Sequence, residues 1–283
     1  MILAEPYSDV VAQHGEGPVW DPTDESLALV DMLRGDVVVV DGSHIDRRHV
    51  GRVAAAIRPR SQGGWVLGVE QGFALAGRSF TEPSHLPPLW SDTDLRMNDG
   101  ACDPYGAFLC GSLSTSGRPG AGALYRMTSD HEVKEVLGQI TTSNGLGWSL
   151  DGSRAYFIDS ATQRLDEYRY DETGGFSDQR PLARIPVADG IPDGLTVDAE
   201  GGVWVALYGG SAVVRYAPDG RLTHRVRVPV SQPTACTFGG PGLATLLVTT
   251  SSLGLERGSE PLAGAVFAVV PGVVGQPSQA FGG

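Results

Sequence analysis

The sequence of 283 residues contains few cysteines and no long hydrophobic run. Its three cysteines, Cys102, Cys110 and Cys236, are odd in number and none has a C-x-x-C spacing. This pattern predicts buried free thiols in a reducing compartment and argues against both a disulfide framework and a zinc–thiolate site. The longest apolar stretches, such as residues 264–270, are too short to cross a bilayer.

Other features that the sequence lacks narrow the expected cellular compartment and binding partners of the protein. The first ten residues lack a basic segment followed by an apolar core, so we expect no secretory signal and a cytoplasmic protein. The formal net charge is −12 and no basic stripe offsets it, which argues against nucleic acid and anionic membranes as partners. No coiled-coil heptad is present, so a monomer is the default expectation.

Several catalytic motifs are also missing. The chain has no G-x-S-x-G elbow and no H-E-x-x-H pair, which excludes the common serine-hydrolase and zinc-protease signatures. Matches to G-x-G-x-x-G carry no weight because no strand–helix–strand unit surrounds them.

What the chain has in abundance is turn residues and a repeat. Its 39 glycines and 19 prolines are spread along the whole length, as in an all-β protein. A polar residue, a glycine, an alternating strand, a turn and a second strand recur at intervals of roughly 40–50 residues, the period of propeller blades. The six copies are residues 16–32, 53–72, 98–113, 144–160, 193–209 and 233–251.

The repeat predicts an all-β, six-bladed β-propeller that forms a single domain over residues 1–283. A β-sandwich would show similar alternation, but the fixed period argues against it. We expect a strand around Ile2–Ala4 to complete the last blade beside residues 264–271 and so close the ring.

The polar residue before each first strand is the candidate functional feature. In this register lie Glu16, Asp99, Asn144 and Asp193, each before a glycine. Because the innermost strand of every blade starts near the central channel, these side chains would converge on one axis, and oxygen donors gathered there would repel each other unless a cation lies between them. Asn-Gly and Asp-Gly are also common turn dipeptides, and we interpret residues 41–42, 151–152 and 219–220 as turns only.

At these residues the chain resembles the family of regucalcin (senescence marker protein), gluconolactonase and luciferin-regenerating enzyme. The resemblance covers nearly the whole chain and rests on five segments in order: residues 15–22, 96–113, 143–160, 191–208 and 238–250. It implies a six-bladed propeller with one divalent cation in the central channel, and a sugar lactone as the substrate of many members.

The resemblance also implies roles for individual residues. It identifies Glu16, Asn144 and Asp193 as metal ligands, Asn98 as a residue near the metal or substrate, and Arg96 as a substrate contact. It thus favours Asn98 over Asp99, and a bulge within residues 97–100 would turn Asn98 inward. We keep Asp99 as a reserve contact.

One loop departs from the family pattern. Regucalcin-type members place an acidic residue before the segment G-A-L-Y, whereas residues 114–121 here contain Arg118 and no acid. The glycines of this loop suggest a mobile lid. The change puts the substrate preference in doubt.

The expected chemistry is hydrolysis of a sugar lactone such as gluconolactone. Carboxylate and amide oxygens suit a hard cation, with Ca²⁺ as the first candidate and Mg²⁺, Mn²⁺ or Zn²⁺ as alternatives. Asp193 could take a proton from water and return it to the leaving hydroxyl, and Asn98 could donate to the oxyanion. His14 is interpreted as a hydrogen-bonded loop histidine.

Two other functions stay open at this point. One is a promiscuous esterase or phosphotriesterase on the same metal site. The other is a non-catalytic, calcium-binding protein.

Overall fold

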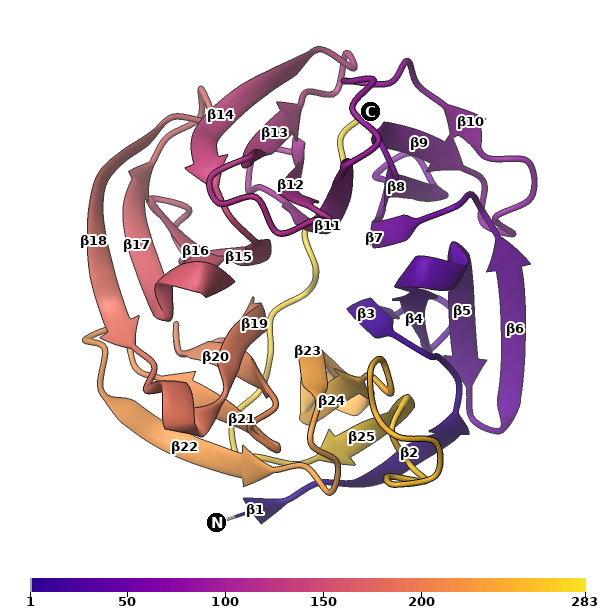
Figure 1. The fold of residues 1–283 in the computed structure, drawn as a ribbon, viewed down its shortest axis with the longest axis vertical. Helices are drawn as coiled ribbons and strands as arrows, with labels where there is room; N and C mark the ends of the chain where they lie inside the picture. The colour runs from indigo at the N-terminus through magenta and orange to yellow at the C-terminus, as the bar shows by residue number, and fades with distance from the viewer. Residues whose placement is uncertain (1) are drawn as a thin grey trace.

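Six β-sheets surround a central axis, each running from the axis to the rim (Figure 1). The computed structural model describes residues 2–283. Blades 1 to 3 contain β3 (Gly15–Asp21), β4 (Ser26–Asp31), β5 (Asp36–Asp41) and β6 (His44–His49); β7 (Ala54–Pro59), β8 (Trp65–Val69), β9 (Gly72–Ala76) and β10 (Ser84–His85); and β11 (Leu95–Cys102), β12 (Phe108–Ser114), β13 (Gly122–Met127) and β14 (Val133–Ile140).

The second half of the ring repeats this order. Blades 4 to 6 contain β15 (Ser143–Trp148), β16 (Arg154–Asp159), β17 (Arg164–Tyr170) and β18 (Phe176–Arg184); β19 (Ile191–Val197), β20 (Val203–Tyr208), β21 (Ala212–Tyr216) and β22 (Leu222–Arg227); and β23 (Pro233–Gly239), β24 (Thr245–Thr250), β25 (Ala265–Val269) and β2 (Glu5–Val10). The predicted six-bladed propeller is therefore confirmed.

The helices are single turns. They are η1 (Met32–Arg34), η2 (Ser160–Thr162), η3 (Val187–Asp189) and η4 (Pro241–Leu243). Within residues 2–283, none of the helices has the length and apolar character that a membrane crossing requires.

The middle strands of the blades are covered on both faces. All six residues of β4 are buried, as are all five of β8. Each blade packs its two faces against its neighbours, so the centres of these strands, such as residues 27–30 of β4, are continuously apolar instead of alternating. Apolar burial between the blades is thus the main force that holds the ring together.

The N-terminal segment closes the ring, but with different residues than expected. Glu5–Val10 pairs antiparallel with β25 and completes blade 6. Ile2–Leu3, which forms β1, instead pairs parallel with β22 at the outer edge of blade 5. The assignment of the closing strand to Ile2–Ala4 was therefore wrong by a few residues: the chain crosses from blade 5 to blade 6 at Ala4.

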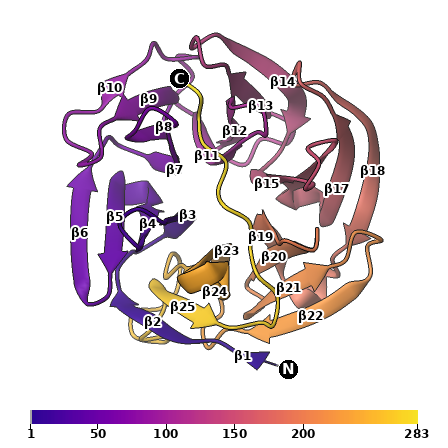
Figure 2. The same cartoon turned by 180° about the vertical axis from the view of Figure 1, so that it is seen from behind.

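The last segment of the chain crosses the rear of the ring (Figure 2). Gly275 bridges to Asp198 of blade 5, and Phe281 bridges to Arg60 after β7 of blade 2. The Phe281 side chain is fully buried, and its amide donates to the Pro59 carbonyl at 2.8 Å. Residues 271–283 therefore lie across the rear end of the channel and tie distant blades together.

Blade 5 holds a buried ion pair in its first turn. Asp198 accepts from the amides of Glu200 and Gly202, from Trp204 Nε1 at 2.7 Å and from Arg215 Nε at 2.5 Å. The side chain of Asp198 is fully buried and that of Arg215 is 6% exposed. Removing one partner of such a pair leaves the other charge buried without compensation.

We expect Asp198→Ala to lower the free energy of unfolding by about 3–5 kcal/mol, because Arg215 loses its buried counter-charge and keeps only its ion pair with the exposed Glu200. Urea denaturation measures this change. The matched control is Asp219→Ala, a turn aspartate that is 67% exposed and 3.9 Å from Arg221. A surface pair contributes about 0–1 kcal/mol, so equal effects of the two substitutions would contradict this account.

Candidate functional site

The innermost strands carry a bulge where each candidate residue lies. The register of β11 on β12 shifts between Met97 and Gly100, that of β15 on β16 between Ser143 and Leu146, and that of β19 on β20 between Pro192 and Leu195. In β3, Glu16 is the last paired residue before the shift. A bulge adds a residue to one strand and redirects its side chain, and here it turns polar groups from four blades toward the axis.

Two of the glycines that follow these residues, Gly145 and Gly194, are required for a different reason from the glycines in turns. A Cβ on Gly145 would lie 2.8 Å from the Asp193 carbonyl oxygen, and one on Gly194 would lie 2.5 Å from the Ala235 Cβ. Gly42, Gly152 and Gly220 instead have positive φ angles, as tight turns require. The turns predicted at residues 41–42, 151–152 and 219–220 are therefore confirmed, whereas Asn144-Gly145 and Asp193-Gly194 lie where inner strands of adjacent blades approach closely.

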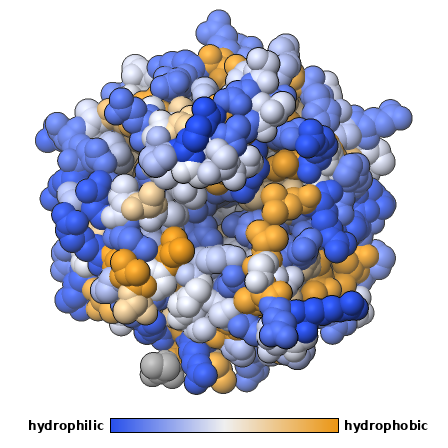
Figure 3. Space-filling view, in the orientation of Figure 1, coloured by the Kyte–Doolittle hydropathy of each residue, from blue (hydrophilic) through white to orange (hydrophobic). Residues whose placement is uncertain are grey.

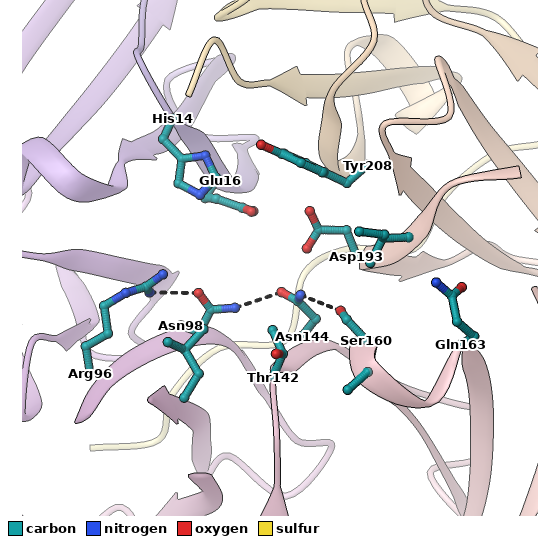
Figure 4. A pocket seen from close by; sticks show the side chains of 13 residues that line it. His14, Glu16, Arg96, Asn98, Thr142, Asn144, Ser160, Gln163, Asp193 and Tyr208 are labelled. Atoms are coloured by element: carbon teal, nitrogen blue, oxygen red, sulfur yellow. Dashed lines mark hydrogen bonds between the residues drawn. The ribbon is translucent and has the colours of Figure 1, made fainter. Parts of the chain in front are cut away.

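A cavity of about 390 Å³ opens among these strands. It lies on the face that carries η2, where the space-filling view shows a hollow at the centre of the ring (Figure 3). All of the predicted ligand and substrate residues line it, together with side chains that the sequence did not single out (Figure 4). The lining residues that carry the argument are Glu16, Arg96, Asn98, Asn144, Asp193 and Tyr208.

A one-way chain of hydrogen bonds runs along one wall of the cavity. Arg96 Nη1 donates to Asn98 Oδ1 at 2.7 Å, and Asn98 Nδ2 donates to Asn144 Oδ1 at 2.8 Å. Asn144 Nδ2 donates to Ser160 Oγ at 2.7 Å, and Ser160 Oγ donates to the Pro192 carbonyl at 2.6 Å. The chain fixes the orientation of both amides and ends beside Asp193.

This chain corrects the hypothesis that Asn98 stabilises an oxyanion. Asn98 Nδ2 also donates to the Ser143 carbonyl at 2.7 Å, so both of its N–H groups have acceptors. An amide has only two such donors. Asn98 therefore presents its oxygen, which keeps an acceptor position beside Arg96.

The choice between Asn98 and Asp99 is resolved by the bulge. Asn98 occupies the same bulge position as Asn144 and Asp193, whereas Asp99 occupies that of Gly145 and Gly194. Asp99 is buried but does not line the cavity, and its Oδ1 accepts from the Gly100 amide at 2.7 Å. The alignment of the repeats on the residue before each glycine, which selected Asp99, was therefore off by one residue.

The two carboxylates of the cavity share an unfavourable electrostatic environment. Burial raises the pKa of Glu16 well above its usual range, and the charges of Asp193 and Asp99 raise it further. Burial and the charge of Asp99 likewise raise the pKa of Asp193. Burial lowers the pKa of Arg96, and this arginine forms no ion pair with any side chain in residues 2–283.

The donor set fits a hard divalent cation. No three His, Cys, Asp or Glu side chains in the described part of the chain are grouped to hold a metal ion. The cavity offers two carboxylates, Glu16 and Asp193, and the amide oxygen of Asn144, whose second lone pair is not used by Asn98. Oxygen ligands of this kind suit Ca²⁺, Mg²⁺ or Mn²⁺ better than zinc, and a cation would relieve the repulsion that raises both carboxylate pKa values.

The loop of Arg118 is held in place. Arg118 donates to Asp92 Oδ2 at 2.7 Å and to Asp94 Oδ2 at 2.8 Å, and Asp94 also accepts from Thr115 and Ser116. Hydrogen bonds from Ser114, Thr115 and Ser116 lower the pKa of Asp94. The expectation of a mobile lid is therefore not supported: the loop is tied to the segment before β11, and Arg118 does not line the cavity.

Several cavity residues had no clear signal in the sequence. Ser160 follows β16, the second strand of blade 4, and Tyr208 is the last residue of β20, the second strand of blade 5; the repeat placed no candidate at either position. His14 is both a hydrogen-bonded residue, as interpreted, and part of the cavity lining. Burial and the nearby Arg96 lower its pKa to about 4.

Comparisons with known proteins point to one family. Residues 14–252 match the family model described as SMP-30/Gluconolactonase/LRE-like region. The Bacillus subtilis protein YvrE is 34% identical over 268 residues, and the match covers 92% of both chains. YvrE carries the name of a sugar lactone lactonase.

Solved structures of similar proteins have the same fold. A calcium-binding regucalcin from Agrobacterium tumefaciens is 25% identical, with a TM-score of 0.93 over 99% of this chain and 97% of its own. A luciferin-regenerating enzyme is 30% identical, with a TM-score of 0.89 over 98% of this chain and all of its own. The resemblance noted in the sequence is confirmed.

We expect Asp193→Asn to stabilise the metal-free protein at neutral pH. A carboxylate whose pKa is raised by folding costs no stability below its unfolded pKa of about 4, and its cost grows as the pH rises toward the raised value. Removing the charge should raise Tm in chelator by a few degrees, since about 1 kcal/mol shifts a domain of this size by roughly 2–4 °C.

Thermal melts with chelator and with added Ca²⁺ measure this effect. Asp178→Asn, at a position whose side chain is 67% exposed, is the control and should leave both melts unchanged. A lower Tm for Asp193→Asn in chelator would show that this carboxylate does not destabilise the metal-free protein.

Proposed function

Because the chain belongs to the SMP-30/gluconolactonase/LRE-like family, we propose that it is a metal-dependent hydrolase of a sugar lactone such as gluconolactone. Glu16, Asn144 and Asp193 hold one divalent cation, with Ca²⁺ as the first candidate. When bound, the cation supplies Lewis-acid polarisation of the ester carbonyl.

Asp193 is the proposed general base and acid. Its carboxylate accepts a proton as the oxygen of water attacks the carbonyl carbon of the lactone. The bond between that carbon and the ring oxygen then breaks, and Asp193 returns the proton to the ring oxygen, which leaves as a hydroxyl. The product is the open-chain aldonic acid.

Arg96 and Asn98 position the substrate. Arg96 donates through Nη1 to Met32 Sδ, to the Met97 carbonyl and to Asn98 Oδ1, and in residues 2–283 its other N–H groups have no acceptor and no carboxylate holds it away from a ligand. Asn98 presents an acceptor oxygen beside it. Together they offer a donor and an acceptor to adjacent hydroxyl groups of a sugar.

One observation carries this proposal. Two buried carboxylates with raised pKa values, an oriented amide oxygen and an unpaired arginine line the same cavity of about 390 Å³. That volume is within the range of small-molecule sites. A structural role alone would not require an arginine without an ion-pair partner beside two buried acids with raised pKa values.

Calcium binding without catalysis is the second candidate. It is favoured by the similarity to the Agrobacterium tumefaciens regucalcin, which is described as a calcium-binding protein. Arg96 and the cavity volume distinguish the two functions, because a simple cation store uses neither.

We expect chelator-stripped protein to hydrolyse aldonolactones only after a divalent cation is restored. The test is a panel of glucono-, xylono-, arabino- and galactonolactone with Ca²⁺, Mg²⁺, Mn²⁺ and Zn²⁺ added singly. Asp193→Ala should lower kcat/KM by about 10²–10⁴-fold, the usual contribution of a general acid–base.

The control is Asp178→Ala, an exposed aspartate on β18 that should leave turnover unchanged. Tight cation binding without hydrolysis of any lactone would support the calcium-binding alternative. Full activity of Asp193→Ala would contradict the role assigned to this residue.

A further inference from the structure

His14 lies at the seam between the first and last blades, where its backbone is fixed. It forms an isolated antiparallel bridge with Ser251, which follows β24. Its amide donates to Asp31 Oδ1 at 3.1 Å, and its carbonyl accepts from the Met32 amide at 2.9 Å. The residue is 9% exposed, so its ring has little freedom to move.

The surroundings of Ser251 determine the tautomer of this ring. Ser251 Oγ accepts from the Leu253 amide at 3.0 Å and lies 2.8 Å from His14 Nδ1 but 3.4 Å from the Gln13 carbonyl. That carbonyl already accepts from the amide and the hydroxyl of Ser252. The Tyr208 hydroxyl is the other hydrogen-bonding neighbour of the Ser251 side chain. The short contact to His14 favours donation of the Ser251 proton to Nδ1, an arrangement in which Nδ1 is an acceptor and the ring hydrogen is on Nε2.

The N–H of Nε2 then faces the cavity without a protein partner. None of the side chains or carbonyls in residues 2–283 forms a hydrogen bond with this nitrogen. Figure 4 shows the ring directly beside Glu16, with Tyr208 to its right and the Arg96–Asn98 pair across the opening. A buried donor without an acceptor costs free energy unless water or a ligand accepts from it.

We propose that His14 is a substrate-binding residue whose Nε2–H donates to a hydroxyl oxygen of a polyhydroxylated lactone, and that Ser251 is the positioning residue that fixes its tautomer. This inference rests on the proposed function for the identity of the ligand. It adds a contact on the wall opposite Arg96, so that the hydroxyl groups of the sugar are held from two sides.

The first test does not depend on turnover. The tautomer of His14 is read from the ¹⁵N shifts of histidine-labelled protein, with His14→Gln to assign the signal. We expect the Nε2–H form in the wild type and a mixture in Ser251→Ala. An Nδ1–H form in the wild type, or an Nε2 signal that shifts when Ca²⁺ is added because it ligates the ion, would overturn the proposal.

The second test compares lactones with and without hydroxyl groups. We expect His14→Phe to lower the ratio of kcat/KM for gluconolactone to that for δ-valerolactone by about three- to tenfold, the effect of one lost hydrogen bond. His14→Gln, whose amide nitrogen can replace Nε2–H, should restore most of this ratio. His44→Phe on the exposed outer strand β6 is the control. An unchanged ratio in His14→Phe overturns the proposal.

If the wild type hydrolyses neither lactone, the proposed function fails. The role of His14 is then tested by ligand binding alone. Gluconate and valerate are then added to the labelled protein. A shift of the His14 Nε2–H signal with gluconate but not with valerate supports the contact. Equal shifts, or none, overturn it.

Discussion

The burial of like charges at the centre of the ring is the constraint on which the site depends. Glu16, Asp99 and Asp193 are each less than 10% exposed, and burial raises the pKa of all three. Arg58 offsets part of this effect at Asp99 and Arg96 offsets part of it at Glu16, whereas none of the described cations lowers the pKa of Asp193. Glu16 and Asp193 face a cavity in which a divalent cation would neutralise them, and this unmet charge is the physical basis for the proposed metal site.

The scaffold produces this concentration of charge through backbone geometry. Six innermost strands approach one axis, and a bulge in each of four of them turns a polar side chain inward. The approach is so close that Gly145 and Gly194 have no room for a Cβ. The chain of hydrogen bonds that begins at Arg96 and ends at the Pro192 carbonyl orients the side-chain amides of the two asparagines in the cavity. The polar groups are therefore positioned before any ligand binds.

The repeat could be predicted from the sequence because each blade uses the same local pattern of strands and turns. Features that depend on how the strands pair, or on contacts between distant parts of the chain, could not be predicted from the sequence. Asn98 replaces Asp99 in the cavity because the bulge falls one residue earlier than the glycine suggests. His14 and Ser251 are 237 residues apart and meet only because the ring closes.

The two ends of the chain and the loop of Arg118 were also beyond sequence reasoning. The closing strand is Glu5–Val10, since Ile2–Leu3 finds a partner on blade 5. Residues 271–283 have no strand pattern, yet they lie across the rear of the ring. The glycines near Arg118 suggested mobility, but Asp92 and Asp94 hold that loop.

The most direct test of this account is an anomalous-diffraction map from crystals soaked in Mn²⁺. The account predicts one strong peak in the cavity on the face that carries η2, within bonding distance of oxygen atoms of Glu16, Asn144 and Asp193. A cavity without a peak, or a cation bound elsewhere while these three side chains keep their present hydrogen bonds, would contradict it.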